Sequence, residues 1–178
     1  LVEIVKARSF REGPEMRLAS GKTSTIYFNM KPTMLDSEGA FLIASLILDQ
    51  LDGVEADLIG GLEMGAVPIA SSVATLAHTR GRKLPAFFVR KQAKEHGTKS
   101  LIEGLGRDDT ISGKRVVIVE DVTTTGGSSI KAADAVRQAG GNVVSVITIV
   151  DRLDGAAEAF AAAEYPFFAL LTRADFKS

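Results

Sequence analysis

Short apolar runs that alternate with helix-like segments constrain the fold of this chain most strongly. Runs of strand length occupy Asp57–Gly61, Pro85–Val89, Val116–Val119, Val143–Val150 and Phe167–Leu171. Segments with helical character lie at Ala40–Leu51, Ala66–Ala77, Ser128–Gln138 and Ala156–Ala163. This alternation is typical of βαβ units and predicts an α/β fold with a central, mostly parallel sheet flanked by helices on both faces. Residues 1 to about 30 do not follow the alternation, and we expect them to form a small N-terminal lobe.

Length and composition exclude several classes of protein. The 178 residues are enough for one domain with a substantial core, so we expect a single domain over residues 1–178. A net charge of −1 gives no global basic surface, which argues against a nucleic-acid partner. No apolar run approaches the roughly 20 residues of a membrane span. The absence of cysteine rules out disulfides and thiolate metal sites, and it agrees with a cytoplasmic location.

Polar and glycine-rich segments follow the apolar runs directly. They occupy Gly60–Gly65, Arg90–His96, Glu120–Ser128 and Asp151–Arg152. In an open α/β sheet, ligands bind beyond the carboxyl ends of the strands. The sequence therefore predicts that these four segments meet around one binding site.

The segment Arg115–Ser129, RVVIVEDVTTTGGSS, carries the most specific signal. A buried strand ends in Glu120 and Asp121, a run of hydroxyls and glycines follows, and a helix then begins. Glycines let the backbone approach a ligand closely, and the helix N-terminus adds unpaired N–H groups and a partial positive charge. Such a turn can cup a phosphate, while the two carboxylates suit neutral hydroxyls such as those of a ribose. A sugar phosphate satisfies both halves.

Other interpretations of this turn are weaker. A Walker A loop needs GK[ST] after its glycines, whereas Gly127 is followed by two serines. The GxGxxG fingerprint of dinucleotide-binding proteins is absent as well. An ordinary strand–helix turn with chance hydroxyls is the remaining alternative.

The segment resembles the 5-phosphoribosyl 1-diphosphate (PRPP) signature of type I phosphoribosyltransferases. The resemblance implies the fold of that family, with the N-terminal lobe as a small hood over the sheet. It also implies that Glu120 and Asp121 bind the ribose hydroxyls and that the following turn holds the 5′-phosphate. The residues expected to contact PRPP here are Glu120, Asp121, Val122, Thr123, Thr124, Thr125, Gly126, Gly127 and Ser128.

A concentrated basic segment narrows the choice of family. Phe88–Gly104 places Arg90, Lys91, Lys94 and Lys99 within ten residues, with His96 among them. From the residues alone this is either a solvated loop or a site for diphosphate with Mg²⁺. The string RKxxKxHG resembles the catalytic loop of orotate phosphoribosyltransferases.

That resemblance implies a role for four residues of the segment and a quaternary structure. Arg90, Lys91, Lys94 and His96 are expected to contact PRPP, with Lys94, His96 and Arg90 catalytic. The chain is expected to form a homodimer in which loop 90–106 reaches the neighbouring active site. Mg²⁺ is expected to arrive on PRPP or pyrophosphate rather than on protein ligands.

Two further segments match the same family. Ser20–Asn29 resembles its orotate-contacting N-terminal segment, with Tyr27 and Phe28 at the base-contacting positions, although a plain hairpin with buried aromatics fits these residues too. Arg152 ends an apolar strand. A guanidinium there suits the carboxylate of orotate, and the resemblance implies that Arg152 and Thr124 bind it. A surface ion pair is the alternative for Arg152.

The chain departs from the family at two positions where lysine is common. Gly65 and Ala19 stand there, so two direct charges on the diphosphate are missing. Backbone N–H groups around Glu63–Ala66, together with Lys22, are candidates to replace them.

The sequence thus predicts an orotate phosphoribosyltransferase activity in pyrimidine biosynthesis. The reaction converts orotate and PRPP into orotidine 5′-phosphate and pyrophosphate. A transferase for another base and a nucleic-acid-binding regulator of the same fold are the alternatives. The first would need no carboxylate-binding arginine, and the second would show a basic face.

Overall fold

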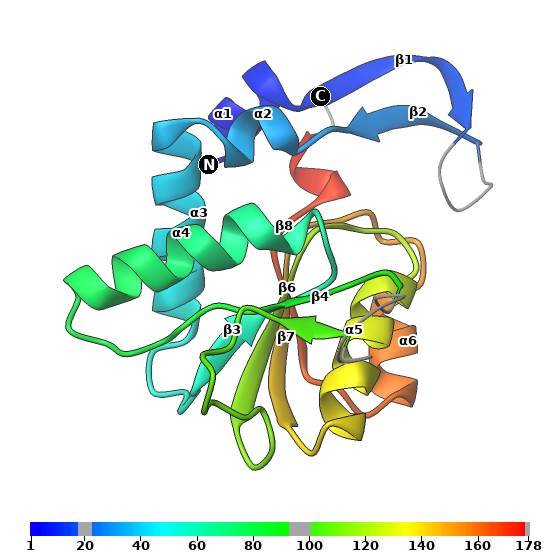
Figure 1. Ribbon diagram of the computed structural model, residues 1–178. Coiled ribbons are helices and arrows are strands. Elements are labelled where there is room, and N and C mark those ends of the chain that lie inside the picture. Colours follow the sequence, from blue (N-terminus) through cyan, green and yellow to red (C-terminus); the bar gives the residue numbers. More distant parts are fainter. Residues whose placement is uncertain (18–22, 93–100, 177–178) are drawn as a thin grey trace.

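A computed structural model describes residues 1–17, 23–92 and 101–176. Its centre is a sheet in the order β3 (Leu58–Gly60), β6 (Arg115–Thr123), β7 (Asn142–Asp151) and β8 (Phe167–Thr172). All pairings in this sheet are parallel, and Figure 1 shows it below the N-terminal elements. Bridges from Ile59 to Ala86 and from Leu62 to Val89 extend it beyond β3. The predicted parallel α/β architecture is therefore confirmed.

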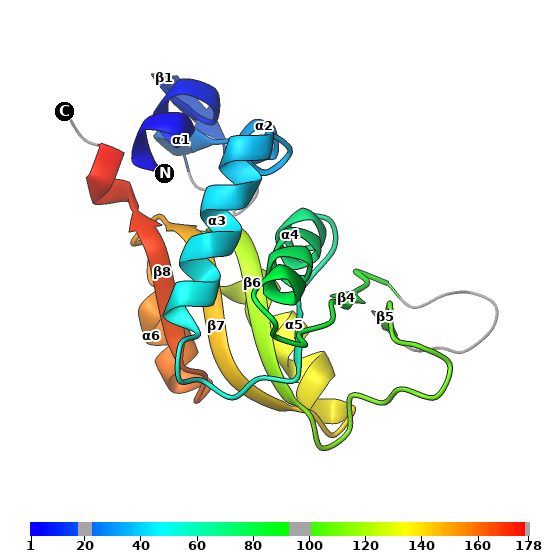
Figure 2. The same cartoon turned by 90° about the vertical axis from the view of Figure 1, so that its left-hand side faces the viewer.

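Alternate residues of the central strands face two separate cores. Val117 and Val119 belong to the core beneath α3 (Ser37–Gln50) and α4 (Ala66–Thr79). Val116 and Ile118 belong to the core beneath α5 (Gly127–Gln138) and α6 (Ala156–Ala162). The two helix pairs lie on opposite faces of the sheet (Figure 2). Because β6 is buried on both faces, its run of β-branched residues forms the centre of the molecule.

The N-terminal elements form a hood above one end of the sheet. They are α1 (Val2–Arg8), the antiparallel pair β1 (Phe10–Arg17) and β2 (Thr23–Phe28), and α2 (Lys31–Met34). The C-terminal turn η1 (Arg173–Phe176) joins them (Figure 1). The rings of Phe10, Phe28 and Phe176 lie with centroids 5.0–5.4 Å apart. This aromatic cluster ties the hood to the C-terminal end of the chain.

Several helix and strand boundaries differ from the sequence-based expectation, and the strand expected over Pro85–Val89 is reduced to Phe88–Val89. Helix α3 begins at Ser37 rather than Ala40, because the Asp36 side chain accepts hydrogen bonds from the Glu38 and Gly39 N–H groups. Residues 92–107, expected to be only a loop, contain β5 (Ile102–Glu103), which pairs with β4 (Phe88–Val89). Leu101 and Ile102 pack against the core beneath α5, which accounts for this local order. No helix in the described ranges is long and apolar enough to span a membrane.

Candidate active site

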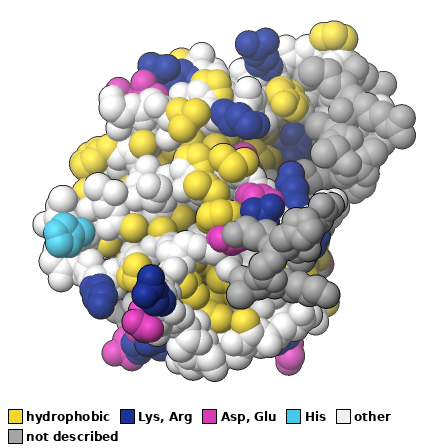
Figure 3. Space-filling model, viewed as in Figure 1, with side chains coloured by type: hydrophobic (Ala, Val, Ile, Leu, Met, Phe, Trp, Pro, Cys, Tyr) yellow, Lys and Arg dark blue, Asp and Glu magenta, His cyan; other side chains and the backbone are white. Residues whose placement is uncertain are grey.

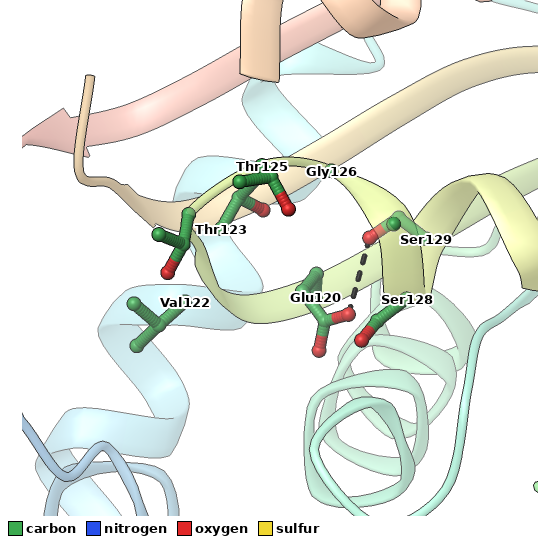
Figure 4. A pocket seen from close by; sticks show the side chains of 9 residues that line it. Glu120, Val122, Thr123, Thr125, Gly126, Ser128 and Ser129 are labelled. Atoms are coloured by element: carbon green, nitrogen blue, oxygen red, sulfur yellow. Dashed lines mark hydrogen bonds between the residues drawn. The ribbon is translucent and has the colours of Figure 1, made fainter. Parts of the chain in front are cut away.

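The turn after β6 forms a cavity at the carboxyl edge of the sheet. Strand β6 ends at Thr123, and α5 begins at Gly127 with Gly126 as its N-cap residue. The cavity has a volume of about 310 Å³. It is lined by Glu120, Val122, Thr123, Thr124, Thr125, Gly126, Gly127, Ser128 and Ser129 (Figure 4). Every residue that the sequence assigned to the phosphate turn, with the exception of Asp121, lines this cavity.

The backbone of the turn explains its glycine. Gly126 has φ of 82°, in the left-handed region that side chains disfavour. A Cβ there would also approach the ring of Phe160 to 3.2 Å. Thr123, which is 2% exposed, has a hydroxyl without a hydrogen-bond partner in the described parts of the chain. A buried hydroxyl of this kind gains a hydrogen bond when a polar ligand enters.

The acidic pair stands at the edge of this cavity. Glu120 is 7% exposed, and its Oε2 accepts a hydrogen bond from the Ser129 hydroxyl at 3.1 Å (Figure 4). Burial, followed by the neighbouring charge of Asp121, raises the pKa of Glu120 to about 8. The raised pKa favours the protonated form of Glu120 in the ligand-free chain. The neutral carboxyl repels a nearby phosphate less and can donate a hydrogen bond to a sugar hydroxyl.

A second cavity adjoins the first and shares Glu120, Val122 and Ser128 with it. Its volume is about 480 Å³. The rest of its lining is Lys31, Met34, Leu35, Leu62, Glu63, Met64, Gly65, Pro68, Lys91 and Asp121. Figure 3 shows a similar mixture of apolar, acidic and basic side chains near the middle of the face seen in Figure 1. The two cavities together provide room for a ligand longer than a single phosphate.

Gly65 lies directly against the acidic pair. A Cβ at this position would come within 2.8 Å of Asp121 Oδ1 and 3.0 Å of Glu120 Oε1. A lysine here would therefore have to displace the two carboxyl groups. The Glu63–Met64 peptide bond just before it is cis. Glycine stands here, where the family commonly has lysine, and the carboxyl groups of Glu120 and Asp121 occupy the space that a side chain would need.

Of the four residues of the basic segment that were expected at the site, the structure describes Arg90 and Lys91. Lys91 lines the second cavity. Arg90 lies 4.0 Å from Glu103 through its Nη1 atom, and its Nε donates to the carbonyl of Gln92. Lys94 and His96 lie outside the described residues, as do Lys99, Lys22 and Ala19.

Arg152 is buried between the sheet and the hood. It is 2% exposed, and it donates to the Ile26 carbonyl at 3.1 Å and to the Ser24 hydroxyl at 2.9 Å. Its main-chain N–H donates to the carbonyl of Thr123. The alternative of an exposed surface ion pair is therefore wrong, although Arg152 Nε does lie 3.5 Å from Asp154.

Tyr27 and Phe28, the two expected base contacts, face opposite sides of β2. Phe28 is 6% exposed and its ring centroid lies 5.9 Å from the Arg152 guanidinium carbon. Tyr27 is 42% exposed. Since consecutive strand residues point in opposite directions, the structure brings Phe28, but not Tyr27, to the arginine.

Comparisons with known proteins agree with this geometry. Residues 33–163 match the phosphoribosyl transferase domain family. A protein of Rhodopseudomonas palustris (strain BisB18) called orotate phosphoribosyltransferase is 57% identical over 176 residues. The match covers 99% of this chain and 94% of that protein. The chain belongs to the orotate phosphoribosyltransferase family.

Solved structures of this orotate phosphoribosyltransferase family share the fold described above. The Mycobacterium tuberculosis enzyme in complex with Fe(III) dicitrate has a TM-score of 0.82 and 38% identity, over 98% of this chain and 95% of that one. The same enzyme in complex with PRPP has a TM-score of 0.79 and 35% identity, over 98% and 94% of the two chains. The second complex shows that this member of the orotate phosphoribosyltransferase family binds PRPP.

Several residues that line the cavities were not assigned to the site from the sequence, among them Ser129, Lys31 and the side chain of Glu63. Ser129 bonds to Glu120, and the GGSS string held that signal because a helix residue nine positions on can reach back to the strand end. Glu63 and Lys31 line the second cavity. The sequence placed only the backbone around Glu63 at the site, and it gave no signal for Lys31, because the position of Lys31 depends on how the hood meets the sheet.

Proposed function

We propose that this chain is an orotate phosphoribosyltransferase of pyrimidine biosynthesis. It transfers the phosphoribosyl group of PRPP to orotate, giving orotidine 5′-phosphate and pyrophosphate. The observation that carries the proposal is the pair of joined cavities at the end of β6, which share Glu120 and Ser128. One cavity suits a phosphate and the other a longer anionic group, and the acidic pair lies where a ribose would join them.

The geometry supports a division of labour among the residues. The hydroxyls and N–H groups of Thr123–Ser128 hold the 5′-phosphate, as the helix N-terminus favours an anion. Glu120 and Asp121 bind the ribose hydroxyls, and the diphosphate lies in the second cavity beside Lys91. Orotate binds through Arg152 and Thr124, with Phe28 on the hood side.

Arg152 has enough N–H groups to donate hydrogen bonds to the orotate carboxylate. A guanidinium carries five N–H groups, and two hydrogen bonds from Arg152 to the hood are formed. Its Nε makes no hydrogen bond among the described residues, although it lies 3.5 Å from the Asp154 carboxylate. Because Arg152 is almost fully buried, binding of the orotate carboxylate requires β2 to shift away from it.

The reaction is a displacement at the anomeric carbon of the ribose. Orotate N1 forms the new bond as the bond to the diphosphate oxygen breaks, the electron pair leaves with pyrophosphate, and the N1 proton is released to the departing pyrophosphate. Positive charge develops on the sugar in an oxocarbenium-like transition state, so no protein nucleophile is required. Catalysis comes from positioning and charge stabilisation, with Arg90, Lys94 and His96 assisting the departing anion.

Mg²⁺ fits this site as a companion of the substrate. The carboxyl groups that line the second cavity belong to Glu63, Glu120 and Asp121, and they are hard oxygen donors. Within residues 1–17, 23–92 and 101–176 there is no cluster of three or more histidine, cysteine or acidic side chains that could hold a metal. We therefore propose that Mg²⁺ is held mainly by diphosphate oxygens, whose negative charge it neutralises.

We also propose a cytoplasmic homodimer in which loop 90–106 completes the site of the neighbouring subunit. The support is the resemblance of the basic segment to the family's catalytic loop. Lys91, at the start of this loop, lines the second cavity of its own subunit, and Lys94 and His96 are the residues expected to reach the neighbouring site. Mixing Lys94→Ala with Glu120→Gln subunits tests the shared site, since hybrid dimers would contain one site with both residues intact. Recovery of activity on mixing supports the arrangement, and its absence in a proven hybrid dimer argues against it.

One assay tests the proposed reaction. Loss of orotate absorbance is followed after adding PRPP and Mg²⁺, with adenine, hypoxanthine and uracil as competing bases in parallel. We expect turnover with orotate and none with the other three. Equal or faster turnover of another base would assign the chain to a different specificity.

A further inference from the structure

Two charged side chains hold the main chain of Lys91 from opposite sides. Glu63 Oε1 accepts a hydrogen bond from the Lys91 N–H at 2.8 Å. The Lys131 ammonium donates to the Lys91 carbonyl at 3.0 Å. Glu63 belongs to the loop after β3, and Lys131 lies in α5, which begins at the phosphate turn. The contacts therefore connect Lys91 with both neighbouring parts of the site.

The contact from Glu63 continues a short ladder of backbone hydrogen bonds. The Val89 N–H donates to the Gly61 carbonyl, and the Glu63 N–H donates to the Val89 carbonyl, both at 2.8 Å. At Lys91 the Glu63 carboxylate takes the place that the next backbone carbonyl would hold. The ladder therefore reaches two residues further toward the basic segment than backbone pairing alone carries it.

The negative charge of Glu63 allows its two possible effects on PRPP binding to be separated by substitution. Its carboxylate lines the cavity proposed for the diphosphate, where a negative charge is unfavourable to an anion. Its effect on PRPP binding thus has two opposing parts, repulsion of the ligand and placement of Lys91. Glutamine removes the charge and keeps an oxygen acceptor, whereas alanine removes both.

We propose that Glu63 is a positioning residue that acts through the main chain of Lys91, with Lys131 as a second support. The two contacts fix where the Lys91 ammonium enters the second cavity and so set the affinity for the diphosphate part of PRPP. This inference rests on the proposed function. Lys91 lines that cavity together with Glu63, which gives its cation direct access to an anion bound there.

The test is steady-state kinetics of orotate consumption with varied PRPP. We expect Glu63→Ala to raise the KM for PRPP by roughly 5- to 20-fold, in keeping with loss of one charge-assisted hydrogen bond. Glu63→Gln is expected within about twofold of the wild type or below it, and kcat is expected to change little in either variant. Lys131→Met is expected to raise the same KM by a smaller factor, because its contact is exposed.

A double-variant cycle tests whether the effect passes through Lys91. In a Lys91→Ala background, Glu63→Ala is expected to add little to the rise in KM. Full additivity would overturn the proposal, as would equal KM values for Glu63→Ala and Glu63→Gln. If Glu63→Ala fails to fold by circular dichroism, Lys131→Met in the two Lys91 backgrounds decides by the same criterion. If the proposed function itself were wrong, the wild-type protein would show no turnover of orotate, which distinguishes that outcome from a failure of the role of Glu63.

Discussion

Burial of Glu120 should make the stability of the ligand-free chain depend on pH. Folding raises the pKa of this carboxyl from 4.5 to about 8, so the folded chain binds the proton more tightly than the unfolded chain. The stabilising contribution is full below about pH 4.5 and is lost as the pH rises toward 8. At about 1.4 kcal/mol for each pKa unit, the loss is under about 1 kcal/mol at pH 5, about 3 kcal/mol at pH 7 and about 5 kcal/mol at pH 9.

Glu120→Gln removes this titration while keeping the shape of the side chain. The free energy of unfolding in urea, measured without ligands, should shift in favour of the variant by about 4 kcal/mol between pH 5 and pH 8.5. Ser129→Ala is the matched variant with the opposite sign. The Ser129 hydroxyl lowers the pKa of Glu120, so its removal should destabilise the chain more at high pH than at low pH. A difference between wild type and Glu120→Gln that stays constant over this range would refute the reasoning.

Three further substitutions test other parts of the site. Gly126→Ala should lower the free energy of unfolding in urea by roughly 1–2 kcal/mol, because of its left-handed backbone and the nearby Phe160 ring, and should weaken PRPP binding measured by calorimetry. Arg152→Ala should weaken the binding of orotate by roughly tenfold or more beyond any effect on the binding of PRPP. Calorimetric titrations that show equal losses of affinity for orotate and PRPP would contradict the assignment of Arg152 to the orotate carboxylate. Lys94→Ala should lower turnover by roughly one to several orders of magnitude with an unchanged circular dichroism spectrum, and near-normal turnover would remove this lysine from the chemistry.

The sequence predicted the strand–turn–helix geometry of residues 115–138 well because its information is local. Glu120, the hydroxyls and Gly126 lie within one strand–turn–helix unit, whose geometry follows from the buried strand and the glycine. The parallel sheet was predicted for a similar reason, since the β-branched runs in β6 and β7 have no exposed face. Some boundaries shifted, as at Ser37, where the Asp36 side chain begins the helix earlier. The strand expected over Pro85–Val89 was reduced to β4, which pairs with the unexpected strand β5 in a sheet of its own.

The rest of the site depends on long-range contacts that no local pattern records. Arg152 meets Ser24 and Ile26 across more than a hundred residues of sequence. Glu63 meets Lys91 only because the loop after β3 pairs with the segment around Val89. The exposure of Tyr27 against the burial of Phe28 could be read only once the orientation of β2 was known.

The position of β6 has a consequence for amide hydrogen exchange. This strand is paired on both sides and covered on both faces, so its amides should exchange only when the whole sheet opens. Arg152, the residue proposed to bind orotate, is held by Ser24 and Ile26 of the two-stranded β1–β2 hairpin, whose amides should exchange far sooner. A ligand that contacts both the end of β6 and Arg152 would leave the rates in β6 almost unchanged and slow those in β2. The exchange rates of the β2 amides should therefore report whether a ligand is bound.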